Sequence, residues 1–188
     1  MIRLVGLGTV AVAAAWLLLS AGPVFGQQSP NGTVTATVIA NSGPCISVAP
    51  ATFSYAAEQF SADSAIKTTI PTGSKPVVTN CSNQTSNFLA KGDHATGPSG
   101  TWTLHGAPQF CTSIGANKYR HEINKTDGTD PLVLTTIDQP WETSVPGNGS
   151  AGNTRILDSI LTMPCTTSDG AGTTMSLHIF LTAVISGS

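Results

Sequence analysis

Four cysteines are the residues of this chain with the clearest chemistry: Cys45, Cys81, Cys111 and Cys165. None of them belongs to a C-x-x-C motif or a Cys/His cluster, which argues against a structural zinc site or a thioredoxin-type redox motif. An even number of widely spaced cysteines indicates two disulfides in a chain that is exported, and residues 1–26 of this chain indicate export. Four cysteines allow three pairings, and their spacing alone does not choose between them.

The four histidines, His94, His105, His121 and His178, carry a weaker signal for catalysis or metal binding. None lies three to five residues from another, so the chain has no HxxxH metal pair. His121 shares one side of an alternating segment with Tyr119, which favours a half-buried histidine over a metal ligand. No G-x-S-x-G motif is present. We therefore predict no catalytic residue, cofactor or metal site, and keep a small secreted hydrolase as an alternative.

A short acidic segment raises the question of calcium binding. Residues 124–130 read N-K-T-D-G-T-D, and Asn124, Asp127 and Asp130 could offer oxygen atoms to the ion. Their register does not match an EF-hand loop, in which acidic or amide groups recur two apart before the glycine. We expect a hydrophilic hairpin turn.

Two tryptophans are candidates for packing against a sugar ring. Trp102 alternates with threonines beside Leu104, so we expect it in the core. Trp141 follows Pro140 at the end of a strand and is the better candidate for an exposed ring.

The first 26 residues are typical of a secretory signal peptide. Arg3 gives the N-terminal region a positive charge, residues 5–19 form an apolar region, and small residues precede a cleavage point after Gly26. A membrane anchor would have to continue through Pro23 to reach the roughly 20 residues that a bilayer span needs. We predict cleavage, no membrane span afterwards, and an extracellular, secreted or cell-surface protein.

Composition favours an all-β domain. After the predicted signal peptide, the chain contains five lysines and two arginines against ten acidic residues. These positive charges form no basic patch. Nucleic acid is therefore not an expected partner. Charged residues make up only 10% of the chain, too few to cover the solvent faces of several helices. Abundant serine and threonine suit strands and turns instead.

Alternating apolar residues and turn signals divide the chain into seven to nine strands. We expect residues 27–44 to form an extended arm or strand, and residues 45–188 to form one antiparallel β-sandwich. Within it, residues 156–163 are interpreted as one strand and residues 173–185 as the longest. Alternation places these residues in the core: Val77, Phe88, Trp102, Leu104, Tyr119, Leu161, Leu177, Ile179 and Leu181.

Six segments between residues 45 and 185 resemble strands of bacterial extracellular immunoglobulin-like domains. The resemblance implies an immunoglobulin-like antiparallel β-sandwich of seven to nine strands with two disulfides. The segments are PVVTNCS (76–82), NFLAKG (87–92), GTWTL (100–104), NKYR (117–120), RILDSILTMP (155–164) and MSLHIFLTA (175–183).

The start of this region also resembles pilin-type and spore-coat-type domains, through C-I-S-V-x-P-x-x-F from Cys45. In those families a cysteine that opens the first strand is bonded to one that ends the second, and Cys45 and Cys81 hold these places. The glycine that often follows the phenylalanine is missing here. With the immunoglobulin-like strand order, the resemblance implies the pairs Cys45–Cys81 and Cys111–Cys165.

These features together predict a secreted or cell-surface structural or adhesion module without catalytic activity. A surface protein or a polysaccharide would be its partner. The alternative from another class is a subunit of a surface filament or coat. In that case the arm of residues 27–44 would self-associate by pairing with an edge strand of a neighbouring copy.

Overall fold

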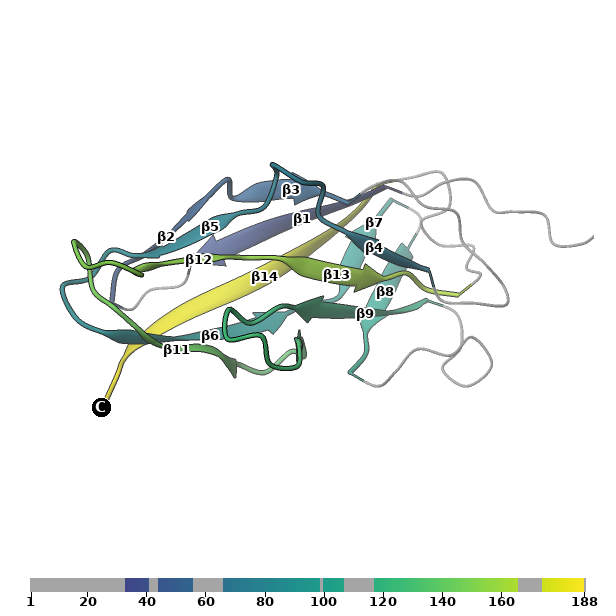
Figure 1. Ribbon diagram of the computed structural model, residues 1–188. Helices are drawn as coiled ribbons and strands as arrows, with labels where there is room; N and C mark the ends of the chain where they lie inside the picture. The colour runs from purple at the N-terminus through teal and green to yellow at the C-terminus, as the bar shows by residue number, and fades with distance from the viewer. Residues whose placement is uncertain are drawn as a thin grey trace, which may run out of the picture.

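The computed structural model describes residues 33–40, 44–55, 66–98, 100–106, 117–165 and 174–187. Every regular element within these ranges is a β-strand, so the expected all-β class is confirmed (Figure 1). No helix among the described residues is long and apolar enough to cross a membrane. The predicted signal peptide and Cys111 lie outside the described residues.

The larger of two sheets contains eleven strands. Its hydrogen-bonded path runs β11 (Gln139–Val145), β6 (Ser86–Gly92), β14 (Thr174–Ile185), β7 (Ala95–Gly97), β8 (Gly100–Leu104), β9 (Lys118–Ile123), β13 (Ser159–Thr162) and β4 (Lys67–Thr69). Beside this path, β1 (Thr33–Ala40) pairs with β14 and with β3 (Thr52–Ser54), and β10 (Leu132–Val133) pairs with β9. The smaller sheet has the order β12 (Thr154–Ile156), β5 (Val77–Asn80) and β2 (Ile46–Ala49).

The larger sheet is mixed, which corrects the expected antiparallel arrangement. β1 runs parallel to β14 over eight residue pairs, and β8 runs parallel to β9. The number of strands, fourteen in the described ranges, also exceeds the seven to nine expected. The additional strands include the three-residue strands β4 and β7, and the segment of residues 156–163 is divided between β12 and β13.

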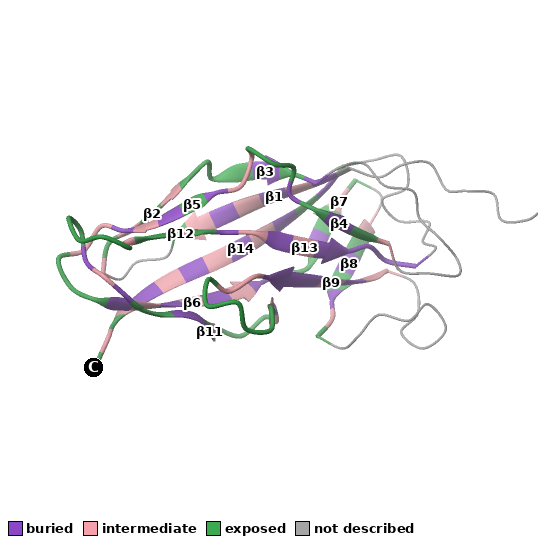
Figure 2. Ribbon diagram, in the orientation of Figure 1, coloured by how far each residue is buried: buried purple, intermediate pink, exposed green. Residues whose placement is uncertain are grey.

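Strand β14 shows how the apolar pattern builds the core. Its odd-numbered residues from Met175 to Ala183 are buried, and the intervening residues face outward (Figure 2). Alternation buries one face of a strand because successive side chains point to opposite sides. Both sheets contribute to the same core, since Val78 of β5 belongs to one apolar cluster with Leu177 of β14 and Leu161 of β13.

Eight of the nine predicted core residues are buried. The exception is Val77, which is 40% exposed, while its neighbour Val78 is fully buried. Val77 pairs with Ile156, itself 60% exposed, on the outer face of the small sheet. The prediction therefore placed the wrong face of β5 in the core. A shift of one residue has this effect because it moves every side chain of a strand to the other side.

Leu177 should be a large contributor to stability, because it is fully buried at the middle of β14. We expect Leu177→Ala to lower the free energy of unfolding by about 3 kcal/mol through lost apolar contact and the cavity left behind. Val184→Ala is the matched control, since Val184 lies on the half-buried outer face of the same strand. Urea unfolding of both variants checks the prediction, and equal losses would contradict the assignment of the core face.

The segment of residues 156–163 is divided between the two sheets, which corrects its interpretation as one strand. β12 belongs to the small sheet and β13 to the large one. Between them, the Leu157 N–H donates to the Pro76 carbonyl (2.8 Å), and the Asp158 carbonyl accepts from the Asn124 N–H (2.8 Å). Leu157 is buried at this crossing, so the apolar residues that suggested one strand anchor a change of layer instead.

The expected arm or strand at residues 27–44 contains β1. Its side chains Val34, Ala36 and Val38 are buried in the core. Both edges of β1 are hydrogen-bonded within the same chain, to β14 on one side and β3 on the other. β1 is therefore an integral strand of the large sheet.

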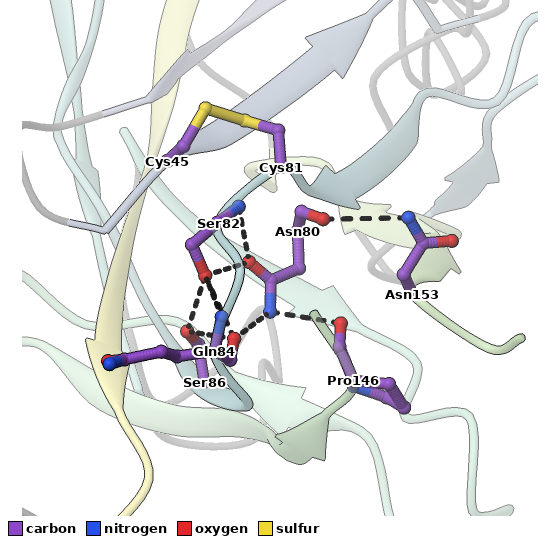
Figure 3. The surroundings of a disulfide bond; sticks show 8 residues. All are labelled: Cys45, Asn80, Cys81, Ser82, Gln84, Ser86, Pro146 and Asn153. Carbon is purple, nitrogen blue, oxygen red and sulfur yellow. Dashed lines mark hydrogen bonds between the residues drawn. A yellow bond between two sulfur atoms is a disulfide. The ribbon is translucent and has the colours of Figure 1, made fainter. Parts of the chain in front are cut away.

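The disulfide Cys45–Cys81 is present, with 4.9 Å between the Cα atoms. It joins the residue before β2 to the residue after β5, beside a polar network around the buried Asn80 (Figure 3). The Asn80 amide nitrogen donates to the carbonyls of Gln84 (2.9 Å), Val145 and Pro146 (3.0 Å each). Cys165 is buried after β13, and its expected partner Cys111 lies outside the described residues.

Candidate functional site

Two adjoining cavities open beside β12 and the turn that follows β9. The first, about 320 Å³, is lined by Lys125, Thr126, Asp127, Pro140, Trp141, Glu142, Thr143 and Arg155. The second, about 490 Å³, is lined by Lys75, Asn124, Lys125, Thr126, Thr154, Arg155, Ile156 and Asp158. Because they share Lys125, Thr126 and Arg155, we treat the two cavities as one site, called the Arg155 groove.

The ion pair of Arg155 and Glu142 holds the centre of the groove. Arg155 Nε donates to Glu142 Oε2 (2.9 Å), and its Nη1 donates to the Gly152 and Thr154 carbonyls (2.7 and 2.8 Å). The other Glu142 oxygen accepts from the Thr126 N–H (2.6 Å). The two side chains are only 15% and 7% exposed. Charge-assisted hydrogen bonds of this kind fix β11, β12 and the turn after β9 relative to one another.

The turn at residues 124–130 connects the antiparallel strands β9 and β10, as the hairpin-turn prediction stated. Asp127 Oδ1 accepts from the backbone N–H and the hydroxyl of Thr129 (3.0 and 2.7 Å), and these bonds lower the pKa of the Asp127 carboxyl. The Asn124 side chain donates to Asp158 instead of joining an acidic cluster of the turn (3.2 Å). The turn thus uses its polar groups to fix its own shape and its contact with Asp158, the residue before β13.

Trp141 is 2% exposed, so its expected role as an exposed sugar-binding ring is wrong. Its indole N–H donates to the Asn124 carbonyl (2.8 Å), and its ring stacks on Phe88. The cause is a register shift between β11 and β6 after Pro140, which buries Trp141 and Glu142 in succession. A β-bulge redirects side chains in this way. Trp102, expected in the core, is fully buried.

The second cavity carries the less constrained groups of the groove. Lys75 Nζ lies 2.8 Å from Asp158 Oδ2, and both side chains are about one third exposed. Lys125 lies between the two cavities. Ile156 offers an exposed apolar surface at the same cavity. Such a lining combines charge, hydroxyl groups and one apolar contact.

A Ser–His contact exists in the core, built from three distant segments. The Tyr55 hydroxyl lies 2.7 Å from His121 Nε2 and also hydrogen-bonds the Ser159 hydroxyl, which is 3.4 Å from the same nitrogen. All three residues are buried, and burial lowers the pKa of His121 to about 3. Burial likewise raises the pKa of Tyr55. His121, expected to be half-buried, is thus a neutral member of a core network.

His94 and His178 serve structural contacts elsewhere. His178 Nδ1 lies 2.6 Å from Asp93 Oδ2, and its backbone N–H donates to Asp93 Oδ1 (2.8 Å). His94 Nδ1 accepts from the Leu104 N–H (3.1 Å). No group of three or more potential metal-binding side chains occurs among the residues that the structure describes.

The residues that form the Arg155 groove were largely missed by sequence reasoning. Lys75, Glu142 and Arg155 carry no functional motif. The turn at residues 124–130 was singled out for calcium, and Trp141, which lines the first cavity, for an exposed sugar-binding ring. The chain matches no protein-family model, and a search of curated proteins finds no similar sequence.

Proposed function

We propose that this protein is a secreted or cell-surface adhesion module of immunoglobulin-like β-sandwich type, without catalytic activity, that binds a surface polysaccharide. The Arg155 groove is the observation that carries the proposal. Its centre is rigid, because Arg155 and Glu142 use their polar atoms on each other and on neighbouring backbone groups. A preorganised polar site of this kind suits recognition, since little side-chain freedom is lost on binding.

Binding is favoured over catalysis by how the charged groups are used. Both Glu142 oxygens already accept hydrogen bonds, and Asp158 is paired with Lys75 and Asn124. A general acid or base needs a proton-transfer position open to its substrate. The Ser159–His121 contact, the obvious start of a hydrolytic site, lies in the core where a substrate does not reach it. These arrangements support a binding module over the hydrolase alternative.

The Cys45–Cys81 disulfide supports an oxidising compartment, in which such bonds form and persist. The predicted signal peptide agrees with this location. The immunoglobulin-like assignment draws support from two sheets that share one core and from the disulfide beside β2 and β5. The pair Cys111–Cys165 remains a prediction of the same assignment.

A filament or coat subunit is the second candidate function, and it would require exchange of β1 between copies. This strand lies between β14 and β3, and it buries Val34, Ala36 and Val38. The same slot would accept β1 of a neighbouring copy, since strand exchange keeps every contact and only changes which chain makes it. Copies joined head to tail in this way would grow into a filament.

One experiment on the mature protein, beginning at Gln27, separates the two candidates. The adhesion module should elute as a monomer at micromolar concentration and bind to immobilised surface polysaccharide. Ile156→Trp should weaken that binding about tenfold by filling the second cavity. Ile137→Trp is the control, because Ile137 is 73% exposed and lines neither cavity. Concentration-dependent polymers without polysaccharide binding would favour the filament subunit and overturn the first proposal.

A further inference from the structure

Positive charge gathers in the second cavity of the Arg155 groove. After the predicted signal peptide the chain has seven lysines and arginines, and Lys75, Lys125 and Arg155 line this one cavity. Asp158 is the only carboxylate in its lining. The cavity therefore carries an excess of positive charge on a chain whose net charge is −2. A concave site with an excess of one sign of charge attracts ligands of the opposite sign.

Lys125 is the cation available to a ligand. Arg155 is committed to Glu142 and to two carbonyls, and Lys75 is paired with Asp158. Within the described residues, the Lys125 ammonium makes no hydrogen bond or ion pair. The nearby Asp127 directs one carboxylate oxygen to Thr129 and lines only the first cavity. Beside the hydrogen bonds from Thr129, the charge of Lys125 helps to lower the pKa of the nearby exposed Asp127 carboxyl, but Lys125 and Asp127 form no ion pair in the described structure, so the Lys125 ammonium can still contact a ligand.

The remaining lining matches a sugar better than a dense polyanion. Thr126 and Thr154 bring hydroxyl groups, Asn124 brings an amide, and Ile156 presents an apolar side chain that is 60% exposed. A sugar ring has hydroxyl groups at its edge and an apolar C–H face, so it can use both kinds of surface. One available ammonium suits a polymer with at most one charge per sugar unit.

From these observations we propose that the Arg155 groove binds an acidic polysaccharide, with a uronate carboxylate placed against Lys125 and the sugar ring against Ile156. The inference rests on the proposed adhesion function and names its ligand class. Lysine suits this role because its ammonium is a compact charge on a flexible chain. Lys75 and Arg155 stay in their ion pairs with Asp158 and Glu142, so the attraction to the carboxylate is assigned to Lys125.

Binding of uronate polymers to the mature protein tests the inference. The probes are polygalacturonate and alginate, with fully methyl-esterified polygalacturonate as the uncharged form and polyglutamate as an acidic polymer without sugar rings. We expect at least one uronate polymer to bind, and the ester and polyglutamate to bind about tenfold more weakly or not at all. Binding should weaken as salt increases, because salt screens exposed charges.

Variants locate the contact. Lys125→Ala should weaken uronate binding about tenfold, and Lys125→Arg should retain most of it. Lys67→Ala is the matched control, since Lys67 is exposed on β4 and lines neither cavity. Equal losses for Lys67→Ala and Lys125→Ala would overturn the inference, as would binding of polyglutamate as strong as that of the uronates. Binding of neutral polysaccharide alone would overturn it too, while leaving the adhesion function in place.

Discussion

Between pH 6.5 and about pH 3, the free energy of unfolding should fall by about 1.4 kcal/mol for each pH unit because of His121 alone. Burial lowers the pKa of His121 from 6.5 to about 3 in the folded protein. In the unfolded chain the side chain binds a proton below pH 6.5, whereas the folded chain resists it. Acid therefore favours the unfolded state, and the loss ends near the folded pKa.

The structure explains why the folded protein resists this proton. His121 Nε2 already meets the hydroxyls of Tyr55 and Ser159. Nδ1 is buried without a hydrogen-bond partner in the described structure, so an added N–H would carry charge with no acceptor. Burying an uncompensated charge is among the most destabilising changes in a core. The integrated loss is on the order of 5 kcal/mol, a large part of the stability of an ordinary domain.

Urea unfolding at several pH values measures this slope. His121→Gln keeps a polar group that can reach Tyr55 but does not titrate, so its stability should depend less on pH below 6.5. Ile137→Gln is the control, because Ile137 is exposed and the change removes no titratable group. Carboxyl groups such as Asp127 also make the free energy of unfolding depend on pH, and this contribution is common to the wild type and both variants. Identical slopes in wild type and His121→Gln would contradict the role of this histidine.

Local patterns predicted the parts of the fold that depend on one strand at a time. The buried face of β14 follows directly from alternation, and so do the buried positions Phe88 on β6 and Trp102 on β8. Alternation is a property of neighbouring residues along the chain, and the core needs it wherever one face of a strand is covered. The turn at residues 124–130 was predictable for the same reason, since its polar residues and glycine act locally.

Features that depend on pairing between distant strands escaped prediction. Val77 and Val78 are equally apolar, and only the pairing of β5 with β12 and β2 decides which one faces the core. Trp141 is buried by a β-bulge where β11 pairs with β6, and the residues next to Trp141 in the sequence do not indicate this bulge. The parallel pairing of β1 with β14 joins the two ends of the described chain.

The candidate site escaped prediction for a related reason. Lys75 precedes β5, Lys125 follows β9, and Arg155 lies in β12, so no spacing along the chain marks them as neighbours. The charges become informative only when the fold brings them to one cavity. The same holds for the Tyr55–His121–Ser159 network, in which the partners of the histidine come from segments 66 and 38 residues away.

Removal of the Cys45–Cys81 disulfide should lower the free energy of unfolding by about 4 kcal/mol. The two cysteines are 36 residues apart. In the chain-entropy model, closing a loop of this length lowers the conformational entropy of the unfolded chain, which raises its free energy by about 4 kcal/mol. The double variant Cys45→Ala/Cys81→Ala is the appropriate change. A single substitution would leave one thiol free to pair wrongly with Cys111 or Cys165.

The surroundings of the bond isolate this entropic contribution. Cys45 is exposed and Cys81 half-buried, so the alanines remove little core contact. The Cys81 N–H still donates to the Cys45 carbonyl (3.0 Å), and the Asn80 network beside it uses no sulfur atom. The folded structure should therefore persist, with an unchanged far-ultraviolet circular dichroism spectrum and a lower urea midpoint. A loss below about 1 kcal/mol would mean that the pairing of β2 with β5 already restricts the unfolded loop without the covalent bond.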